Sequence, residues 1–262
     1  MRIIDIHTHI YPDPIAQKAT DSVADFYGIA GAGMSGTASQ LLERGKSVGI
    51  EKFVVLPVAI RPDRVAGIND FICQQTALHP EFFGFGTLHA EMDNICDEAE
   101  RIVNLGLHGI KMHPDSQRFN IDDPRLLSAY EALQGRIPVM LHMGDIRYSY
   151  SHPARLKRIL EMFPRLEVIA AHFGGYSMYQ EAYDLLHHSD QCIFDISSSM
   201  MFMPEGDAEK YIRAYGCERM AYGTDFPLWD PVQEVSAFLR LKLTDAEREQ
   251  IAHKTAERFL GL

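Results

Sequence analysis

Short runs of consecutive apolar residues recur along this chain. Eight of these runs begin at residues 3, 53, 82, 109, 137, 167, 192 and 220. After a first interval of 50 residues, the starts lie 25–30 residues apart. Continuous rather than alternating apolar character is typical of strands that are buried on both faces of a parallel sheet. The pattern therefore predicts eight parallel strands, each followed by a segment that returns the chain to the next strand.

The segments between these runs have the periodicity of helices. Segments 92–105 and 124–133 each place apolar residues on one helical face. Thr244 and Glu247 have the spacing of a capping box, which predicts a C-terminal helix that ends near Gly261. Strands that alternate with helices over 262 residues match the length of one eight-stranded α/β barrel. We expect a single (β/α)8 TIM barrel that spans residues 1–262.

The long first interval predicts an insertion at about residues 10–52, after strand 1. Two helices are expected there, around 14–26 and 38–48, and the segment between them is rich in glycine. These glycines are Gly28, Gly31, Gly33 and Gly36. A loop after the first strand would lie at the C-terminal end of the barrel. It could cover a site or be an ordinary surface loop, and the sequence leaves both interpretations open.

Composition and charge exclude several classes of partner. The chain has 25 Lys and Arg against 36 Asp and Glu, a formal net charge of -11. Such a surface repels phosphate backbones and anionic lipid, so we expect neither nucleic acid nor membrane as a partner. The four cysteines are scattered without a CxxC pair, which is typical of reduced thiols in a cytoplasmic protein. We expect a small-molecule substrate, and a homodimer is possible for a barrel of this size.

Histidine is unusually frequent, with 12 residues, and several lie where the predicted strands end. Active sites of (β/α)8 barrels lie at the C-terminal ends of the strands. Five of the eight strands end in groups that can titrate or bind a metal. Because separate coincidences would be needed otherwise, this convergence indicates a functional cluster. Its members are His7 and His9, Lys111 and His113, His142, His172, and Asp225.

The first strand ends in a pair that suits a metal ion. His7 and His9 are two residues apart, so both side chains point to the same face of a strand. Neutral imidazole is a good ligand for Zn²⁺ and similar ions. With His142 and Asp225 across the barrel mouth, the sequence predicts a shell of three His and one carboxylate. Asp5 has the same parity and could either orient a ligand His or bond to backbone.

Five segments in this order resemble motifs of the amidohydrolase superfamily. The resemblance is to its single-metal amidohydrolase-2 branch, which contains aminocarboxymuconate-semialdehyde decarboxylase, benzoic-acid decarboxylases, lactonases and other hydrolases. It extends over the whole chain and implies the same barrel. The segments are DIHTH at 5–9, GIKMHP at 109–114, LHMGD at 141–145, AHFGG at 171–175 and YGTDFP at 222–227.

The resemblance also implies roles for individual residues. It implies that His7, His9, His142 and Asp225 hold one divalent ion, with Zn expected first and Mn or Co as alternatives. It implies that His172 contacts the reacting group or its water. Asp225 would then be both a ligand and the proton-transfer group, so that Asp225 and His172 are the expected catalytic residues.

Lys111 leaves the number of ions open. In two-metal relatives, a carbamylated lysine at the end of strand 4 bridges two ions, and the strand-5 and strand-6 histidines bind the second. The resemblance would then place His142 and His172 on that second ion. In the single-metal branch, a lysine at this position binds substrate or is structural. His113, two residues later, could line the pocket.

Two arginines and a tyrosine follow predicted strands and could bind substrate. Arg61 follows strand 2 and Arg147 follows strand 5, and arginine suits bidentate capture of a carboxylate. Each could instead pair with a nearby surface acid. Tyr176 follows strand 6, and Trp229 could wall the pocket or pack beneath the last loop. The candidate substrate-binding residues are Lys111, His113, Arg61, Arg147 and Tyr176.

Three functions are compatible with these features. The first interpretation is a metal-dependent hydrolase that attacks a small ester, lactone or amide with activated water. The alternative is a metal-dependent, non-oxidative decarboxylase of an aromatic or unsaturated carboxylic acid. The chain looks shorter than those decarboxylases, which leaves the choice between the two reactions open. The third interpretation is a binding protein that retains the metal ligands without turnover.

Overall fold

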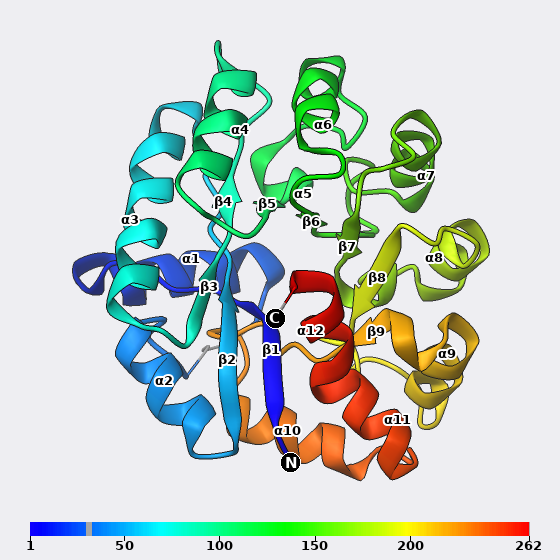
Figure 1. The fold of residues 1–262 in the computed structure, drawn as a ribbon. Helices are drawn as coiled ribbons and strands as arrows, with labels where there is room; N and C mark the ends of the chain where they lie inside the picture. The colour runs from blue at the N-terminus through cyan, green and yellow to red at the C-terminus, as the bar shows by residue number, and fades with distance from the viewer. Residues whose placement is uncertain (30–32, 262) are drawn as a thin grey trace.

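The computed structural model describes residues 1–29 and 33–261; Gly31, one of the glycines noted above, lies outside the described residues. Parallel strands lie at the centre and helices surround them (Figure 1). The strands are β1 (Ile3–Thr8), β2 (Ile50–Val55), β3 (Phe82–Gly84), β4 (Gly86–Thr87), β5 (Ile110–Met112), β6 (Val139–Leu141), β7 (Val168–Ala170), β8 (Cys192–Asp195) and β9 (Met220–Ala221). Since β3 and β4 are separated only by Phe85, they occupy one strand position, and each predicted apolar run overlaps a strand.

Backbone hydrogen bonds join the two sheets into a ring. The strand orders are β1-β2-β3 and β4-β5-β6-β7-β8-β9. The amide of Phe85 donates to the carbonyl of Val55 at 3.0 Å, which connects the sheets on one side. On the other side, the amide of Ile6 donates to the carbonyl of Tyr222 at 3.0 Å, and Thr8 forms a parallel bridge with Phe226. The predicted (β/α)8 barrel is confirmed.

Helices follow the strands around the ring, and side chains at their N-termini explain several starts. Thr37, His152 and Asp230 each accept a backbone amide as helix caps, and Thr244 and Glu247 form the predicted capping box. The helices are α1 (Ala16–Tyr27), α2 (Ala38–Lys46), α3 (Val65–Leu78), α4 (Ile95–Asn104), α5 (Pro114–Gln117), α6 (Leu127–Leu133), α7 (Pro153–Met162), α8 (Tyr179–Leu186), α9 (Asp207–Tyr215), α10 (Pro231–Arg240), α11 (Asp245–Glu249) and α12 (Thr255–Leu260). A π-helical turn, Gln250–Lys254, connects α11 to α12.

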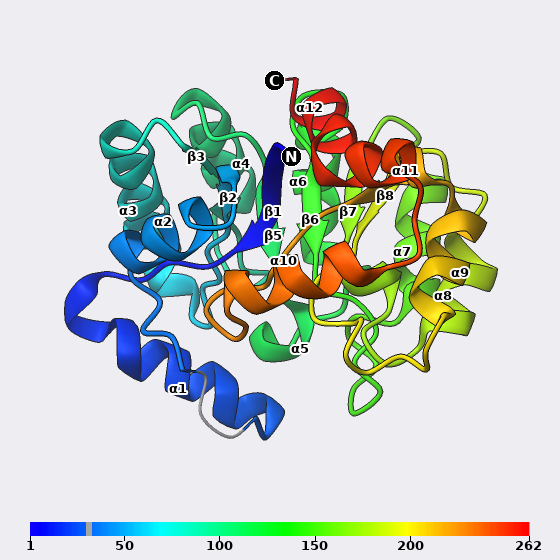
Figure 2. The same cartoon turned by 90° about the horizontal axis from the view of Figure 1, so that it is seen from below.

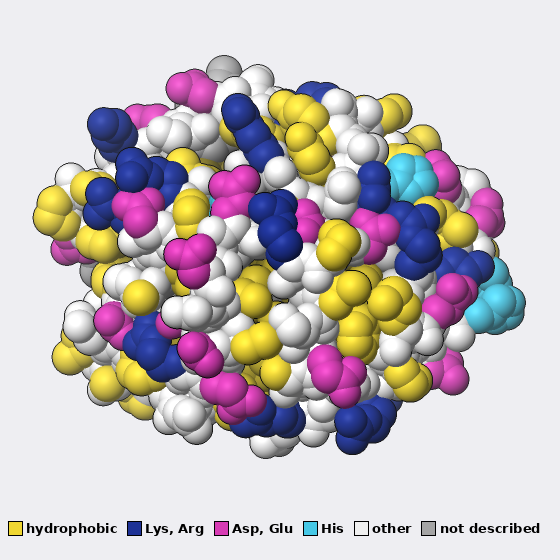
Figure 3. All heavy atoms as spheres, turned by 90° about the horizontal axis from the view of Figure 1, so that it is seen from above, with side chains coloured by type: hydrophobic (Ala, Val, Ile, Leu, Met, Phe, Trp, Pro, Cys, Tyr) yellow, Lys and Arg dark blue, Asp and Glu magenta, His cyan; other side chains and the backbone are white. Residues whose placement is uncertain are grey.

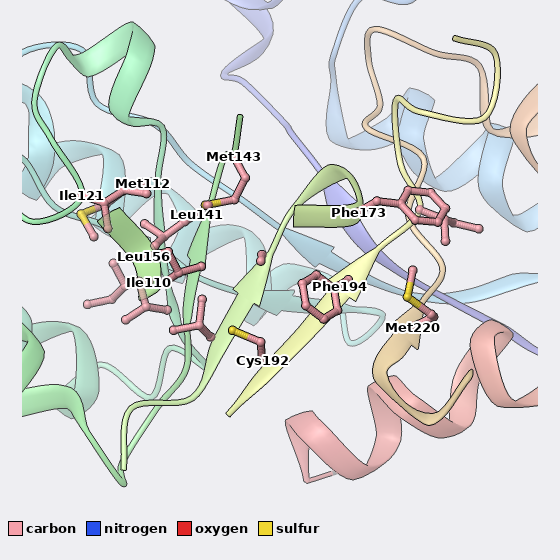
Figure 4. Packing of buried hydrophobic residues seen from close by; sticks show 14 of the residues in the cluster. Ile110, Met112, Ile121, Leu141, Met143, Leu156, Phe173, Cys192, Phe194 and Met220 are labelled. Atoms are coloured by element: carbon pink, nitrogen blue, oxygen red, sulfur yellow. The ribbon is translucent and has the colours of Figure 1, made fainter. Parts of the chain in front are cut away.

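Two hydrophobic clusters explain why the strands are apolar on both faces. The barrel interior contains Ile4, Ile6, Val54, Leu56, Phe85, Met140, Ile169, Ala171, Ile193 and Ala221, with Ala256 of α12 packed against them. The second cluster lies between strands and helices, where Ile110, Met112, Leu141, Leu156 and Phe194 pack together (Figure 4). Successive residues of a strand enter different clusters, so a strand needs apolar residues at consecutive positions.

Helix α1 leaves the ring and lies at the end of the barrel where the strands finish (Figure 2). Both helices expected after the first strand are present, as α1 and α2. The amide of Tyr11 donates to the carbonyl of Gly36 at 2.9 Å, which brings the two ends of the excursion together. This arrangement places the last turn of α1 beside the chemistry at the strand ends.

Positive and negative side chains are interspersed on the face of the molecule that Figure 3 shows. Ion pairs link neighbouring helices and loops, as with Arg101 and Asp70 at 2.7 Å and Arg213 and Glu247 at 2.9 Å. Among the described residues, none of the helices combines the length and apolar character needed to cross a bilayer.

Gly144, in the loop after β6, offers a direct test of the packing at the strand ends. It has φ of 74°, and an added Cβ would lie 2.4 Å from Cα of Gly175. Gly106 has φ of 75° but open space around the same position. We predict that Gly106→Ala costs about 1–2 kcal/mol of backbone strain. Gly144→Ala should cost about 2–5 kcal/mol, because the clash adds to that strain.

Urea unfolding of both variants measures these costs. Equal free energies of unfolding for the two variants would contradict the close approach of Gly144 and Gly175.

Candidate metal centre

The end of β1 presents two imidazoles with their protons on the far side. His7 Nδ1 lies 2.9 Å from Asp195 Oδ2, and His9 Nδ1 lies 2.7 Å from the carbonyl of Leu56. Carboxylate and carbonyl oxygens only accept, so each ring donates from Nδ1 and keeps a lone pair on Nε2. The register of β1 against β2 shifts between Asp5 and Thr8, which breaks strict alternation near His7.

Both of these lone pairs face the carboxylate of Asp225. Asp225 Oδ1 lies 3.4 Å from His7 Nε2 and 3.3 Å from His9 Nε2. Neither ring donates to this carboxylate, so three acceptors converge, an arrangement that favours a cation; the amine of Lys111 lies 3.2 Å from one of them, His7 Nε2. Ligands at about 2.0–2.1 Å around a tetrahedral ion lie about 3.3–3.4 Å from one another. The donor set of His7, His9 and Asp225 thus fits a divalent metal ion.

Backbone strain is concentrated at the same place. His172, Ser198 and Asp225 have φ of 59°, 48° and 61°, in the left-handed region that non-glycine residues rarely adopt. Each follows a strand end, and Ser198 donates a hydrogen bond to Asp225 Oδ2. Such strain persists where the surroundings impose it, and it clusters at functional sites.

His142 and His172 form the other half of the cluster. His172 Nδ1 lies 3.1 Å from the carbonyl of Ser197, which places its proton there and leaves Nε2 as an acceptor. His142 Nδ1 lies 3.1 Å from that Nε2. Ligand atoms of His7, His172 and Asp225 lie within 4.8 Å of one another. The structure therefore places His172 directly with His7 and Asp225, whereas His142 adjoins them through His172.

A second group of potential ligand atoms surrounds the other edge of His142. Atoms of His113, Asp115 and His142 also lie within 4.8 Å of one another. However, the rings of His113 and His142 stack at 3.9 Å with an interplanar angle of 7°. Imidazole lone pairs lie in the ring plane, so stacked rings direct them in parallel rather than toward one ion. The arrangement is therefore one of aromatic packing.

Lys111 lies inside the barrel, next to the converging acceptors. Its side chain is 1% exposed, and Nζ lies 3.2 Å from His7 Nε2. Burial lowers the pKa of Lys111 to about 8, although Asp195 and Asp225 oppose this shift. Burial also lowers the pKa of His7 to about 3, so the ring is neutral and able to act as a ligand.

Asp195, at the end of β8, is the residue that sequence reasoning missed. Its carboxylate accepts from His7 Nδ1, from the amide of His172 at 3.1 Å and from Ser197 Oγ at 2.6 Å. Burial opposes ionisation, but the neighbouring His7 and His172 and these hydrogen bonds hold the pKa of Asp195 below its usual range. An aspartate at the end of an otherwise apolar run, residues 192–196, was the available signal.

Asp5 could either orient a ligand histidine or bond to backbone, and the structure shows that it bonds to backbone. It accepts from the amides of His7 and Thr224 at 3.1 and 3.0 Å, and from Thr224 Oγ1 at 2.6 Å. Burial raises the pKa of Asp5 to about 7. It therefore joins β1 to the segment after β9, while Asp195 orients the His7 ring.

Aromatic side chains wall a small cavity beside His172 and Asp225. Trp229 Nε1 donates to Ser198 Oγ at 2.7 Å, which in turn donates to Asp225. Trp229 thus forms a pocket wall, as one of its two interpretations proposed. The lining residues are Tyr27, Ile29, His142, His172, Tyr176, Ser198, Asp225, Leu228 and Trp229.

Neither of the two candidate arginines lines this cavity. Arg61 has a side chain that is 64% exposed and pairs with Asp63 at 2.9 Å. Arg147 makes a bidentate pair with Asp145, and its Nη1 donates to the carbonyl of Phe26 at 2.6 Å. Neither is among the described residues that line the cavity. For both, the structure supports pairing with a nearby acid and offers no support for capture of a substrate carboxylate.

Comparison with known proteins adds the family. The family model described as Amidohydrolase matches residues 4–262. This chain belongs to the amidohydrolase family. It is therefore an enzyme. The search of curated proteins finds no match for this sequence.

Solved structures support the fold of this amidohydrolase. An uncharacterized TIM-barrel protein, Bb4693 from Bordetella bronchiseptica, has a TM-score of 0.83 at 21% identity, covering 100% of this chain and 99% of that chain. The 5-carboxyvanillate decarboxylase LigW from Sphingomonas paucimobilis has 0.77 at 16%, covering 100% and 99%. A dihydroxybenzoic acid decarboxylase from Polaromonas sp. JS666, with bound manganese and the inhibitor 2-nitroresorcinol, has 0.77 at 16%, covering 100% and 97%.

Asp195→Asn tests how the His7 ring is held. The amide replaces an ionised acceptor with a neutral group that also donates, so the Nδ1–H tautomer of His7 loses its charged partner. Loss of such a partner of a metal ligand typically costs about 10–100-fold in metal affinity. Titration calorimetry with Mn²⁺ measures the dissociation constant, and the exposed Asp184→Asn is the matched control. Equal affinities of Asp195→Asn and the control would contradict this role.

Proposed function

We propose that this amidohydrolase is a metal-dependent, non-oxidative decarboxylase of a small, flat carboxylic acid. The observation that carries the proposal is the aromatic wall of Tyr27, Tyr176 and Trp229, which lines the same cavity as His142, His172 and Asp225. Such a wall binds the faces of an unsaturated ring and keeps water away. Since neither Arg61 nor Arg147 lies on the wall, the substrate we propose has one carboxylate, directed toward the metal ligands.

The residues proposed to hold the ion are His7, His9 and Asp225. His172 lies beside them, and His142 bonds to His172. Zn is the ion we expect first from the imidazole-rich donor set, and Mn or Co are alternatives. When bound, a divalent ion would supply positive charge that binds an anionic group and stabilises charge that develops in the reaction.

Side chains of the protein would transfer the proton that the reaction needs. The substrate would bind as a carboxylate, and Asp225 would take up one proton from solvent. When the carbon–carbon bond breaks, CO₂ leaves and its bonding electron pair stays on the ring carbon. That carbon then takes the proton from Asp225, so each turnover consumes one proton and atoms and charge balance. His172, held at Nδ1 by Ser197 and at Nε2 by His142, would lie beside the reacting group.

Two further points support decarboxylation over hydrolysis. Structural alignments cover 97–99% of two decarboxylases at the fold level, so length alone does not argue against the same reaction. A dihydroxybenzoic acid decarboxylase of this fold has bound manganese, which agrees with a divalent ion at the strand ends. At 16% identity these relatives support the proposal only together with the cavity of this chain.

Hydrolysis of a small ester, lactone or amide is the second candidate. His7, His9 and His172 outweigh the effect of burial and hold the pKa of Asp225 well below its usual range. An ionised carboxylate beside the metal ligands is suited to take a proton from water. His172 would then orient the substrate carbonyl.

A two-ion centre is a variant of either function. Lys111 Nζ lies 3.2 Å from His7, and burial leaves a larger share of the amine neutral and able to react with CO₂. A carbamate there could join ions held by His7 and by His142 with His172. We predict about one divalent ion per chain, measured by plasma mass spectrometry on untagged protein. Two ions per chain, lost in Lys111→Met, would replace the single-ion proposal with this variant.

A substrate panel distinguishes the reactions. We predict CO₂ release from a small aromatic or unsaturated acid, with uptake of one proton per turnover, measured with a CO₂ sensor and a pH indicator. Release of acid from lactones or esters without CO₂ would support the hydrolase instead. Bound metal without turnover on either panel would contradict both and indicate a binding protein.

Asp225→Asn tests the proton-transfer role. The amide keeps an oxygen that can face an ion but cannot carry the proton. We predict that kcat falls by about 10²–10⁴-fold, the usual contribution of general acid–base catalysis. Metal content, measured in the same preparation, should fall far less than in His7→Ala. Unchanged kcat would remove Asp225 from the proposed mechanism.

A further inference from the structure

The last turn of α1 reaches across the strand ends and completes the wall of the site. Tyr27 is the final residue of α1. Its hydroxyl lies 2.6 Å from His113 Nε2 and 3.4 Å from His142 Nε2, and its ring centroid lies 5.6 Å from that of Tyr176. A residue from outside the ring of strands and helices (Figure 2) thus contacts two histidines of the site.

The direction of these hydrogen bonds follows from the backbone. The amide of Ser116 donates to His113 Nδ1 at 3.3 Å, so the neutral His113 ring carries its proton on Nε2. That Nε2 donates to the oxygen of Tyr27. Burial raises the pKa of Tyr27 well above its usual value, so the hydroxyl keeps its own proton. Since His142 Nδ1 donates to His172 Nε2, His142 Nε2 is an acceptor, and the Tyr27 hydroxyl donates to it while accepting from His113.

Arg147 clamps the end of α1 in this position. Asp145 holds the guanidinium through Nε and Nη2, with Nη2 at 2.6 Å from Oδ2. Nη1 donates to the carbonyl of Phe26 at 2.6 Å. The guanidinium carbon also lies 4.7 Å from the ring centroid of Phe26 and 5.2 Å from that of Tyr27. Arg147 thus connects the loop after β6 to the residue before Tyr27 and to Tyr27 itself.

We propose that Tyr27 is a positioning residue for His142 and that Arg147 positions Tyr27. His142 Nδ1 faces His172 at 3.1 Å, and Nε2 faces the Tyr27 hydroxyl at 3.4 Å. The ring is thus held at both nitrogens. This inference rests on the proposed metal centre but not on which reaction occurs there. It also gives Arg147 a role in the site without contact to substrate.

His142 acts on the centre through His172: its Nδ1 donates to His172 Nε2, and ligand atoms of His172, His7 and Asp225 lie within 4.8 Å of one another. Tyr27 therefore holds a histidine that bonds to the centre. Outer partners of this kind fix ring orientation and tautomer, and removing one typically costs about 10–100-fold in metal affinity or activity. The Tyr27 hydroxyl accepts from His113 Nε2 and donates to His142 Nε2. Phenylalanine keeps the aromatic wall but can do neither, so Tyr27→Phe isolates the hydroxyl.

Titration calorimetry with Mn²⁺ alone tests the role of Tyr27. We expect Tyr27→Phe to weaken Mn²⁺ binding by about 10–100-fold. Tyr148→Phe is the matched control, because that ring lies 5.4 Å from the Arg147 guanidinium and is 41% exposed. The control should bind Mn²⁺ like the wild type. Wild-type affinity of Tyr27→Phe, with unchanged thermal unfolding, would overturn the proposal.

A double-mutant cycle tests the role of Arg147. If Arg147 acts through Tyr27, Arg147→Ala weakens Mn²⁺ binding. The double variant with Tyr27→Phe should then have nearly the same Mn²⁺ affinity as the single variant with the lower affinity. Additive losses would overturn the link between the two residues. An increase in KM with unchanged Mn²⁺ affinity in Arg147→Ala would instead assign Arg147 to substrate.

The outcome is separable from that of the proposed function. Loss of Mn²⁺ affinity in Tyr27→Phe together with a wild type that turns over nothing would preserve the positioning role and reject the reaction. Turnover by the wild type with unaltered Mn²⁺ affinity in Tyr27→Phe would support the reaction and reject the positioning role.

Discussion

The ionised carboxylate of Asp195 is the interaction on which the site depends. Buried at the end of β8, it accepts hydrogen bonds from Nδ1 of His7, the amide of His172 and the hydroxyl of Ser197. With its proton on Nδ1, His7 directs the Nε2 lone pair toward Asp225. Asp195 therefore determines which nitrogen of His7 keeps a lone pair, and it also fixes the backbone at His172. A buried carboxylate is costly unless fully bonded, and here donors from three segments meet it.

The barrel makes these contacts possible because it brings distant segments together. Asp5 joins β1 to Thr224 across the point where the ring closes, and Asp195 reaches β1 from β8. Left-handed backbone at His172 and Asp225 then turns each side chain over the mouth. Helix α1, which lies outside the ring, supplies Tyr27 to the wall of the cavity. Strands thus supply the ligands, while loops and α1 supply the enclosure.

Much of this architecture could be predicted from the sequence. Eight apolar runs at regular spacing indicate eight strands, since each strand is buried on both faces and so is apolar at consecutive positions. His7, His9, His172 and Asp225 follow from their places at strand ends, and the structure brings them together. The family motifs agree, because they cover these same strand ends.

Other features depend on contacts that no local pattern specifies. The bond from His7 to Asp195 joins residues 188 positions apart, and only the closed ring brings them into contact. Tyr27 lies in a helix whose path outside the barrel is set by tertiary packing. Arg61 and Arg147 looked equivalent in the sequence, since each follows a strand and precedes or follows an acid. Their difference arises because Arg147 also meets the end of α1, while Arg61 stays mostly exposed.

The central claim is that the lone pairs of His7 and His9 converge with Asp225 on one divalent ion. Anomalous diffraction from crystals soaked in Zn²⁺ or Mn²⁺ tests it most directly. The account predicts an anomalous peak about 2.0–2.2 Å from His7 Nε2, His9 Nε2 and Asp225 Oδ1. No peak at that position, with Lys111 Nζ still bonded to His7 Nε2, would contradict the account.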